Sequence, residues 1–153
     1  MPVTTPLTPA KVLDPAHREL IDHLMNTVAP AWFLVADDEA SALLTALDDD
    51  AARDYVASGC GTVDGAWHVF DLLSPLDRST ATPTQETAVA AVLALAAYAL
   101  NMPELGAIYL SKVQDIDYQH PFVELILNKL DLNAGAQSFR SAAAALGLRV
   151  EVA

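Results

Sequence analysis

The sequence predicts an all-α fold: an antiparallel helical bundle of about six to eight helices, with a short strand as a minor addition. Three observations lead to this prediction. Apolar residues recur at helical spacing in several segments, and proline, glycine or acidic residues separate these segments. An uncharged, alanine-rich stretch covers 87–103. The length of 153 residues suits one domain with one hydrophobic core.

The chain divides by composition into an arm and one domain. The expected parts are a flexible N-terminal arm (1–13) and a single helical domain (14–153), which contains a first helical half (14–76), a linker (77–86) and a half with a helical hairpin (87–147). Prolines and threonines disfavour a helix in the arm, and the linker is the most polar stretch. Neither half alone has enough apolar residues for a core, so we expect one domain.

The first expected helix spans about 15–27. Asp14 is a suitable N-cap, and Pro15 suits the first helical position, where its missing N–H has no partner to lose. After Pro30, the apolar run 31–36 fits either a short buried strand or a helical turn, because periodicity does not separate the two in so short a segment.

Two acidic clusters, 37–39 and 48–50, are expected to open the next two helices. Acidic side chains stabilise the positive end of the helix dipole, and apolar helical runs follow both clusters. A calcium loop would need alternating oxygen ligands and a glycine turn, which neither cluster has. Gly59 is the expected end of the second of these helices.

The glycine-rich segment 59–65 is predicted to be a loop. Downstream, Trp67, Phe70 and Leu73 recur at helical spacing and share one face of the next helix. That helix is expected to end near Ser74 and Pro75.

The second half predicts four helices and a short terminal strand. The helices are expected over about 83–101, from 103 to about 116, after Pro121, and over about 136–146 with its end at Gly147. Leu148, Val150 and Val152 alternate with polar neighbours, which permits a strand.

The uncharged stretch 87–103 needs a choice between a membrane span and a core helix. It covers about 17 residues, fewer than the roughly 20 that cross a bilayer. It is rich in alanine rather than leucine, and it lacks flanking lysine, arginine and aromatic residues. We therefore expect a buried core helix and no membrane partner.

Small residues predict that the helices on either side of Pro103 pack closely as an antiparallel hairpin. Ala94 lies on the first helix and Gly106 on the second, and small side chains allow a short distance between helix axes. Asn101-Met102 supplies the turn, and Pro103 begins the second helix.

This hairpin resembles a single tetratricopeptide repeat unit. Ala97, Tyr98, Leu105 and Leu110 fall where that repeat places its packing residues. The repeat's usual Trp-Leu-Gly-Tyr set is missing, and Tyr118 stands where its proline would be. Since there is no second copy, the hairpin is expected to pack on the other helices of the domain.

Residues from about 50 to 140 also resemble the C-terminal half of an actinobacterial family, domain of unknown function 4192. That family has an alanine- and leucine-rich helix ending in Gly-Asp, a helix ending in Asp-Pro, and a leucine-rich helix ending in Leu-Asp-x-Gly. The corresponding stretches here are Asn101-Met102, Asp117-Tyr118 and 130–135, and Ala52-Arg53-Asp54 is similar to a Val-Arg-Asp stretch of the family. The resemblance implies an actinobacterial or actinophage origin and transfers no activity or site.

The net charge of −12 and the pI near 4.4 limit the choice of partners. An acidic surface repels nucleic acid and anionic membranes, so direct binding to either is not expected. Solubility is one role of this charge. The alternative is an acidic mimic of nucleic acid that inhibits a basic DNA- or RNA-binding protein. The single cysteine, Cys60, forms no internal disulfide, which agrees with a cytoplasmic location.

Cys60 lies between two glycines and is the best candidate nucleophile, with His68 or Asp64 as its base. A reactive cysteine needs such a base within hydrogen-bond reach, and no known cysteine-enzyme motif surrounds this one. We therefore interpret Cys60 as a packed thiol and predict no catalytic residue.

Histidines do not predict a metal site. His17 and His23 lie on different faces of their helix, while His68 and Asp71 share a face but supply only two ligands. His120, before Pro121, is interpreted as the residue that starts a helix. No metal and no cofactor is expected.

The remaining site prediction is a partner-binding surface beside the hairpin, formed by Tyr109, Lys112, Tyr118 and Gln119. The alternative is that both tyrosines simply pack with their hydroxyls in water. The predicted function is a non-enzymatic protein–protein interaction module, such as a small phage or actinobacterial accessory protein that acts on a host factor. A homodimer is a further alternative, because any exposed share of the many alanine and leucine residues would provide an apolar contact surface.

Overall fold

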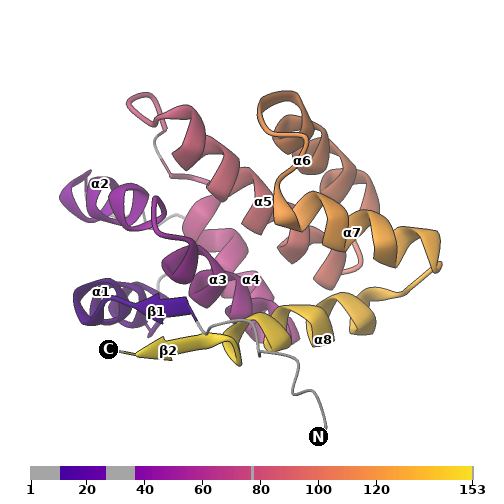
Figure 1. Cartoon of the computed structure of the whole chain (residues 1–153), viewed down its shortest axis with the longest axis horizontal. Helices are drawn as coiled ribbons and strands as arrows, with labels where there is room; N and C mark the ends of the chain where they lie inside the picture. Colours follow the sequence, from indigo (N-terminus) through magenta and orange to yellow (C-terminus); the bar gives the residue numbers. More distant parts are fainter. Residues whose placement is uncertain (1–10, 27–36, 77, 153) are drawn as a thin grey trace, which may run out of the picture.

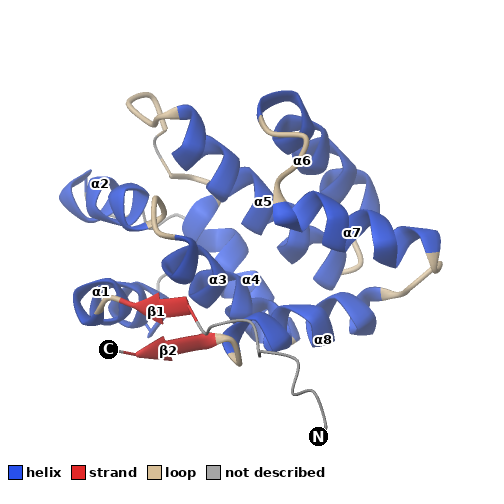
Figure 2. Ribbon diagram, viewed as in Figure 1, coloured by secondary structure: helices blue, strands red, loops and turns tan. Residues whose placement is uncertain are grey.

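The computed structural model describes residues 11–26, 37–76 and 78–152. The segment 31–36, for which the sequence leaves strand and helix open, lies outside the described residues, as do residues 1–10 of the expected arm. Figure 2 shows that helices form most of the described chain and that the two strands are short. The predicted all-α class with a minor strand is confirmed.

The described chain contains eight α-helices, one 3₁₀ turn and two short strands. The helices are α1 (Pro15–Asn26), α2 (Asp37–Ala46), α3 (Asp50–Ser58), α4 (Val63–Leu73), α5 (Pro83–Ala99), α6 (Pro103–Ile116), α7 (Pro121–Asp131) and α8 (Ala136–Gly147). A 3₁₀ turn (Gly59–Gly61) joins α3 to α4, and the strands are β1 (Lys11–Leu13) and β2 (Val150–Val152). The predicted helices match these within a few residues.

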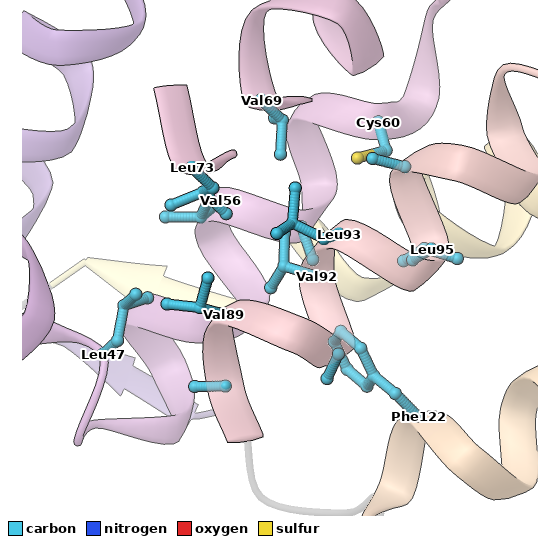
Figure 3. Packing of buried hydrophobic residues seen from close by; sticks show 14 of the residues in the cluster. Leu47, Val56, Cys60, Val69, Leu73, Val89, Val92, Leu93, Leu95 and Phe122 are labelled. Atoms are coloured by element: carbon cyan, nitrogen blue, oxygen red, sulfur yellow. The ribbon is translucent and has the colours of Figure 1, made fainter. Parts of the chain in front are cut away.

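α5 is the central helix of the molecule (Figure 1). It packs against α3, α4, α6, α7 and α8, and every residue from Thr87 to Ala99 is buried. Figure 3 shows side chains of α3, α4 and α7 meeting those of α5, with Val56, Val69 and Phe122 around the α5 residues. The alanine-rich stretch is therefore the core helix that the sequence predicts.

The start of α5 is fixed by a capping box. The side chain of Thr82 accepts a hydrogen bond from the backbone N–H of Gln85, and the side chain of Gln85 accepts one from the backbone N–H of Thr82. Pro83 follows at the first helical position. These residues belong to the stretch that composition assigns to the linker, so polar composition here reflects a helix start.

A tight turn folds α6 back along α5, and the two helices make the most extensive contact in the molecule (Figure 1). Asn101 adopts a left-handed conformation with φ of 59°. The N–H of Met102 donates to the carbonyl of Ala97, and the N–H of Asn101 donates to that of Tyr98. This is the Schellman arrangement that ends many helices.

Gly106 allows the close approach of the two helices. A Cβ at this position would lie 2.7 Å from the ring of Tyr98, closer than side chains tolerate. The predicted packing of the hairpin through a small residue is thus found at Gly106, with the ring of Tyr98 as its direct neighbour.

β1 and β2 pair in parallel, with Lys11 opposite Val150 and Leu13 opposite Val152. Figure 2 shows this small sheet, and β1 packs against α3. The sequence analysis assigns Lys11–Leu13 to the flexible arm, and for these residues the assignment is wrong. Leu13 is fully buried, so the apolar end of the arm is held by the core as well as by the ladder.

The predicted loop over 59–65 is also wrong. Gly59–Gly61 forms a 3₁₀ turn, and α4 already begins at Val63. Thr62 caps α4 through its hydroxyl, which accepts from the N–H of Gly65 at 3.0 Å. A Cβ on Gly65 would lie 2.0 Å from the carbonyl oxygen of Gly59. Gly65 thus allows the start of α4 to pack closely on the 3₁₀ turn, a role that composition does not distinguish from a loop.

No helix among the described residues is both long and apolar enough to cross a bilayer.

Candidate functional site: an aromatic surface on α4 and α6

Three aromatic side chains form a row across α4 and α6. The ring centroids of Trp67 and Phe70 are 6.1 Å apart, and those of Phe70 and Tyr109 are 6.5 Å apart. Both pairs are edge-to-face, with interplanar angles of 79° and 75°. This is a favourable geometry, because the positive edge of one ring meets the negative face of the next. The row therefore connects two helices that are far apart in the sequence.

The row is open to solvent at its α4 end. Trp67 is 44% exposed, while Phe70 and Tyr109 are half-buried against the core cluster. A large aromatic side chain is costly to hydrate, so exposure of this extent at a fixed position is typical of a contact surface.

α6 extends this surface with aliphatic residues and a lysine. The ammonium of Lys112 lies 5.8 Å from the centre of the Tyr109 ring, in a cation–π contact. Ile108 and Ile116 are exposed on the same helix, and Val63 is exposed at the start of α4. We define the aromatic surface by its members: Val63, Trp67, Phe70, Ile108, Tyr109, Lys112 and Ile116.

Two of the four residues predicted for partner binding meet in this surface. Tyr109 and Lys112 contact each other, and Tyr109 also packs on Phe70. Tyr118 and Gln119 lie beyond the end of α6, where Tyr118 is 69% exposed and the backbone N–H of Gln119 donates to Asp117. Their participation stays a prediction.

The sequence analysis misses the exposed end of the row. It places Trp67 on one face with Leu73, yet Leu73 is fully buried and Trp67 is not. The sequence does contain a signal: Asp64 and Asp71 lie three residues before and four residues after Trp67, and residues at these separations share a helical face. Acidic neighbours on both sides indicate a solvent-facing tryptophan.

A second notable group is a buried ionic cluster that joins α3, β1 and α7. Arg53 and Asp54 are both buried, and Nη2 and Nε of Arg53 donate to Oδ1 of Asp54 at 2.9 and 3.0 Å. The ammonium of Lys11 donates to the other carboxylate oxygen of Asp54 at 2.7 Å, and Nη1 of Arg53 donates to Asp50 at 3.1 Å. The guanidinium also lies 5.0 Å from the centre of the Phe122 ring.

His120 completes this cluster from the start of α7. Its Nδ1 accepts a hydrogen bond from the N–H of Phe122 at 3.1 Å, which confirms the prediction that His120 starts the helix. Its Nε2 lies 3.4 Å from Nη1 of Arg53. Burial, and then the charge of Arg53, lower the pKa of His120 to about 4.

The buried cluster suits a structural role. The carboxylate of Asp54 forms ion pairs with Arg53 and Lys11, so its negative charge is already balanced. His120 is neutral at pH 7. Since its Nδ1 accepts a hydrogen bond from Phe122, the ring hydrogen is on Nε2, which therefore does not accept a hydrogen bond from Arg53. The cluster therefore links three elements of the fold.

Cys60 is fully buried, and burial raises the pKa of its thiol to about 12. The thiol thus stays protonated at neutral pH, while His68 and Asp64 face solvent. Figure 3 places Cys60 among apolar core residues such as Val69 and Leu95. Its interpretation as a packed thiol agrees with this position. Within the described ranges, no three potential ligands among His, Cys, Asp and Glu come together for a metal ion.

A scan against models of protein families, a search of curated proteins and a search of solved structures found no match.

Proposed function

We propose that the protein is a non-enzymatic protein-binding module and that the aromatic surface on α4 and α6 is its contact site. The observation that supports this most directly is the ordered row of Trp67, Phe70 and Tyr109 with its tryptophan end open to solvent. Tryptophan and tyrosine dominate the binding energy of many protein interfaces.

The row is suited to binding because it is already held in place. Phe70 and Tyr109 pack partly on the core, so a partner that covers them orders few additional rotatable bonds. Exposed Ile108 and Ile116 add apolar area beside the rings. An aromatic anchor packed on the core and an apolar surround both support the proposal of a contact site here.

The type of protein and its biological origin are proposed from sequence resemblance alone. The hairpin of α5 and α6 is similar to one tetratricopeptide unit, and similarity to domain of unknown function 4192 suggests an actinobacterial or phage accessory protein. In the alternative role, as a mimic of nucleic acid, the partner would be a basic DNA- or RNA-binding protein.

The experiment is site-directed photocrosslinking in an actinobacterial lysate. A photoreactive benzoylphenylalanine replaces Trp67 in one protein and Leu148 in a control. Leu148 is 88% exposed and follows α8, outside the aromatic surface. We expect a discrete protein adduct from position 67 and not from position 148.

Competition makes the result specific. An excess of unlabelled wild-type protein should suppress the adduct, whereas the same excess of Trp67→Ala should leave most of it. Equal adducts at both positions, or equal suppression by both competitors, would contradict the proposed site. Suppression by duplex DNA would favour the mimic.

A further inference from the structure

We infer that the partner presents a positively charged segment, in which arginine or lysine side chains stack on Trp67 and pair with Asp64 and Asp71 while apolar side chains cover Phe70 and Tyr109. This inference rests on the proposed function and adds the chemistry of the partner. It follows from the charges around the aromatic surface and from the state of each ring.

The carboxylates lie beside the exposed ring. On α4, Asp64 precedes Trp67 by three residues and Asp71 follows it by four, so all three side chains lie on one face. Both aspartates are exposed, like Trp67. A cation that stacks on the indole is therefore within reach of a carboxylate on either side.

The two ends of the row differ in their cation contacts. The Tyr109 ring is already paired with the ammonium of Lys112. In the described part of the chain, the only other cation–π contact joins Arg53 and Phe122 in the buried cluster, so none is made to Trp67. Indole is the strongest cation–π acceptor among the side chains. The ring best suited to a cation is thus one that no lysine or arginine in the described ranges stacks on.

The surrounding charge favours the same partner. α4 contains Asp64 and Asp71 and no lysine or arginine, and α6 contains Glu104 and Asp115 against Lys112 alone. The chain as a whole has a net charge of −12. Such a field attracts a basic segment at long range and repels an acidic one.

The test measures binding of three matched synthetic peptides by fluorescence anisotropy. All have leucine at helical spacing, and the remaining positions are arginine, citrulline or glutamate. Citrulline retains the shape and the hydrogen-bonding side chain of arginine without its charge. We expect the arginine peptide to bind wild-type protein at least about tenfold more tightly than the citrulline peptide, and the glutamate peptide not to bind.

Variants localise the effect. Trp67→Ala, and the double variant Asp64→Asn/Asp71→Asn, should each weaken binding of the arginine peptide by about tenfold. Asp37→Asn/Asp38→Asn changes the net charge equally but lies on α2, so it should have little effect. Leu148→Ala is the control for an exposed apolar residue. Unfolding midpoints of all variants verify that each is folded.

The outcomes separate this inference from the proposed function. Equal binding of the arginine and citrulline peptides, or no binding of either, would overturn the basic partner but would leave the crosslinking result at Trp67 intact. Equal losses in the α4 and α2 double variants would show attraction by net charge alone and would also overturn it. If the crosslink at Trp67 fails as well, the proposed function falls.

Discussion

Two asparagines end helices in the left-handed region. Asn101 has φ of 59° after α5, and Asn133 has φ of 54° after α7. In both turns the asparagine N–H donates to the carbonyl three residues back, and the next N–H donates to the carbonyl five residues back. Asparagine tolerates this conformation better than other side chains except glycine, which explains its use at both helix ends.

Replacing Asn101 should reveal this conformational cost. Asn101→Ala is expected to lower the free energy of unfolding by about 1 kcal/mol, because alanine has no local hydrogen bond to offset left-handed strain. Asn101→Gly should preserve or slightly raise stability. Urea unfolding measures both; an alanine variant as stable as the glycine variant would contradict the role assigned to φ.

His120 should make stability fall in mild acid. Its pKa in the folded protein is about 4, below the ordinary value of 6.5, so between these values the unfolded chain binds a proton that the folded protein does not. Its contribution to stability is therefore complete above pH 6.5 and decreases as the pH falls toward 4, by on the order of 3 kcal/mol in total.

The matched variant for this effect is His120→Asn, which retains a side-chain acceptor for the start of α7 and does not titrate. Urea unfolding at several pH values between 4 and 7.5 gives the difference between the two proteins. The other histidines are common to both, so that difference isolates His120. A difference that does not change with pH would show that His120 is not held neutral.

Among the elements, α5 and α6 depend on the contact between Gly106 and Tyr98. Gly106→Ala should lower the free energy of unfolding by about 1–2 kcal/mol, because the added methyl overlaps the ring and this outweighs the gain in helix propensity. In a Tyr98→Leu background the cost should shrink or reverse. Thermal unfolding of wild type, both single variants and the double variant measures this loss of stability. If Gly106→Ala lowers stability equally in the Tyr98→Leu background, the ring is not the cause.

Among the helices and strands, the sequence predicts an element well where a capping signal and apolar helical spacing indicate the same helix. α6 begins at Pro103, and the acidic cluster 48–50 opens α3 as expected. Within this cluster Asp49 is the N-cap, and its carboxylate accepts from the N–H of Ala51 at 2.9 Å. The glycines at 59–65 mislead because their packing role depends on contacts that form only after folding. β1 is missed because its partner strand lies at the other end of the described chain.

The candidate site is predictable only in part, because some of its contacts lie within one helix and others join helices that are distant in the sequence. Tyr109 and Lys112 are neighbours on one helix, so spacing alone brings them together. The contact of Phe70 with Tyr109 joins α4 to α6 and depends on how both helices pack around α5. Local periodicity contains no information about that arrangement.

For the whole molecule, the alanines of α5 bear on self-association. The sequence leaves a homodimer open, because any of its many small apolar residues that are exposed would favour one. From Thr87 to Ala99 they are buried inside the molecule, so this stretch is not available to a second copy. A homodimer would have to use other surfaces.

The buried ionic cluster connects distant parts of the chain, and its removal should affect global stability. Asp54→Asn should lower the free energy of unfolding by on the order of 3 kcal/mol, because it leaves Arg53 buried without its main carboxylate. Asp50→Asn is the control: that carboxylate also pairs with Arg53, but its side chain is 69% exposed, so the cost should stay below about 1 kcal/mol. Urea unfolding measures both variants, and an equal loss of stability in the two would contradict the special role of the buried Asp54 carboxylate.

The parallel pairing of Lys11–Leu13 with Val150–Val152 has a consequence for biosynthesis. The entire helical part of the described chain lies between these two strands, so the ribosome must produce α1 to α8 before the second one exists. Until then the backbone at Lys11 has only water to bond with, although the helices can already collapse. Joining of the two strands is thus a late event of maturation, and released chains truncated before Val150 should be cleaved near Lys11 by proteases that the chain with Val150–Val152 resists.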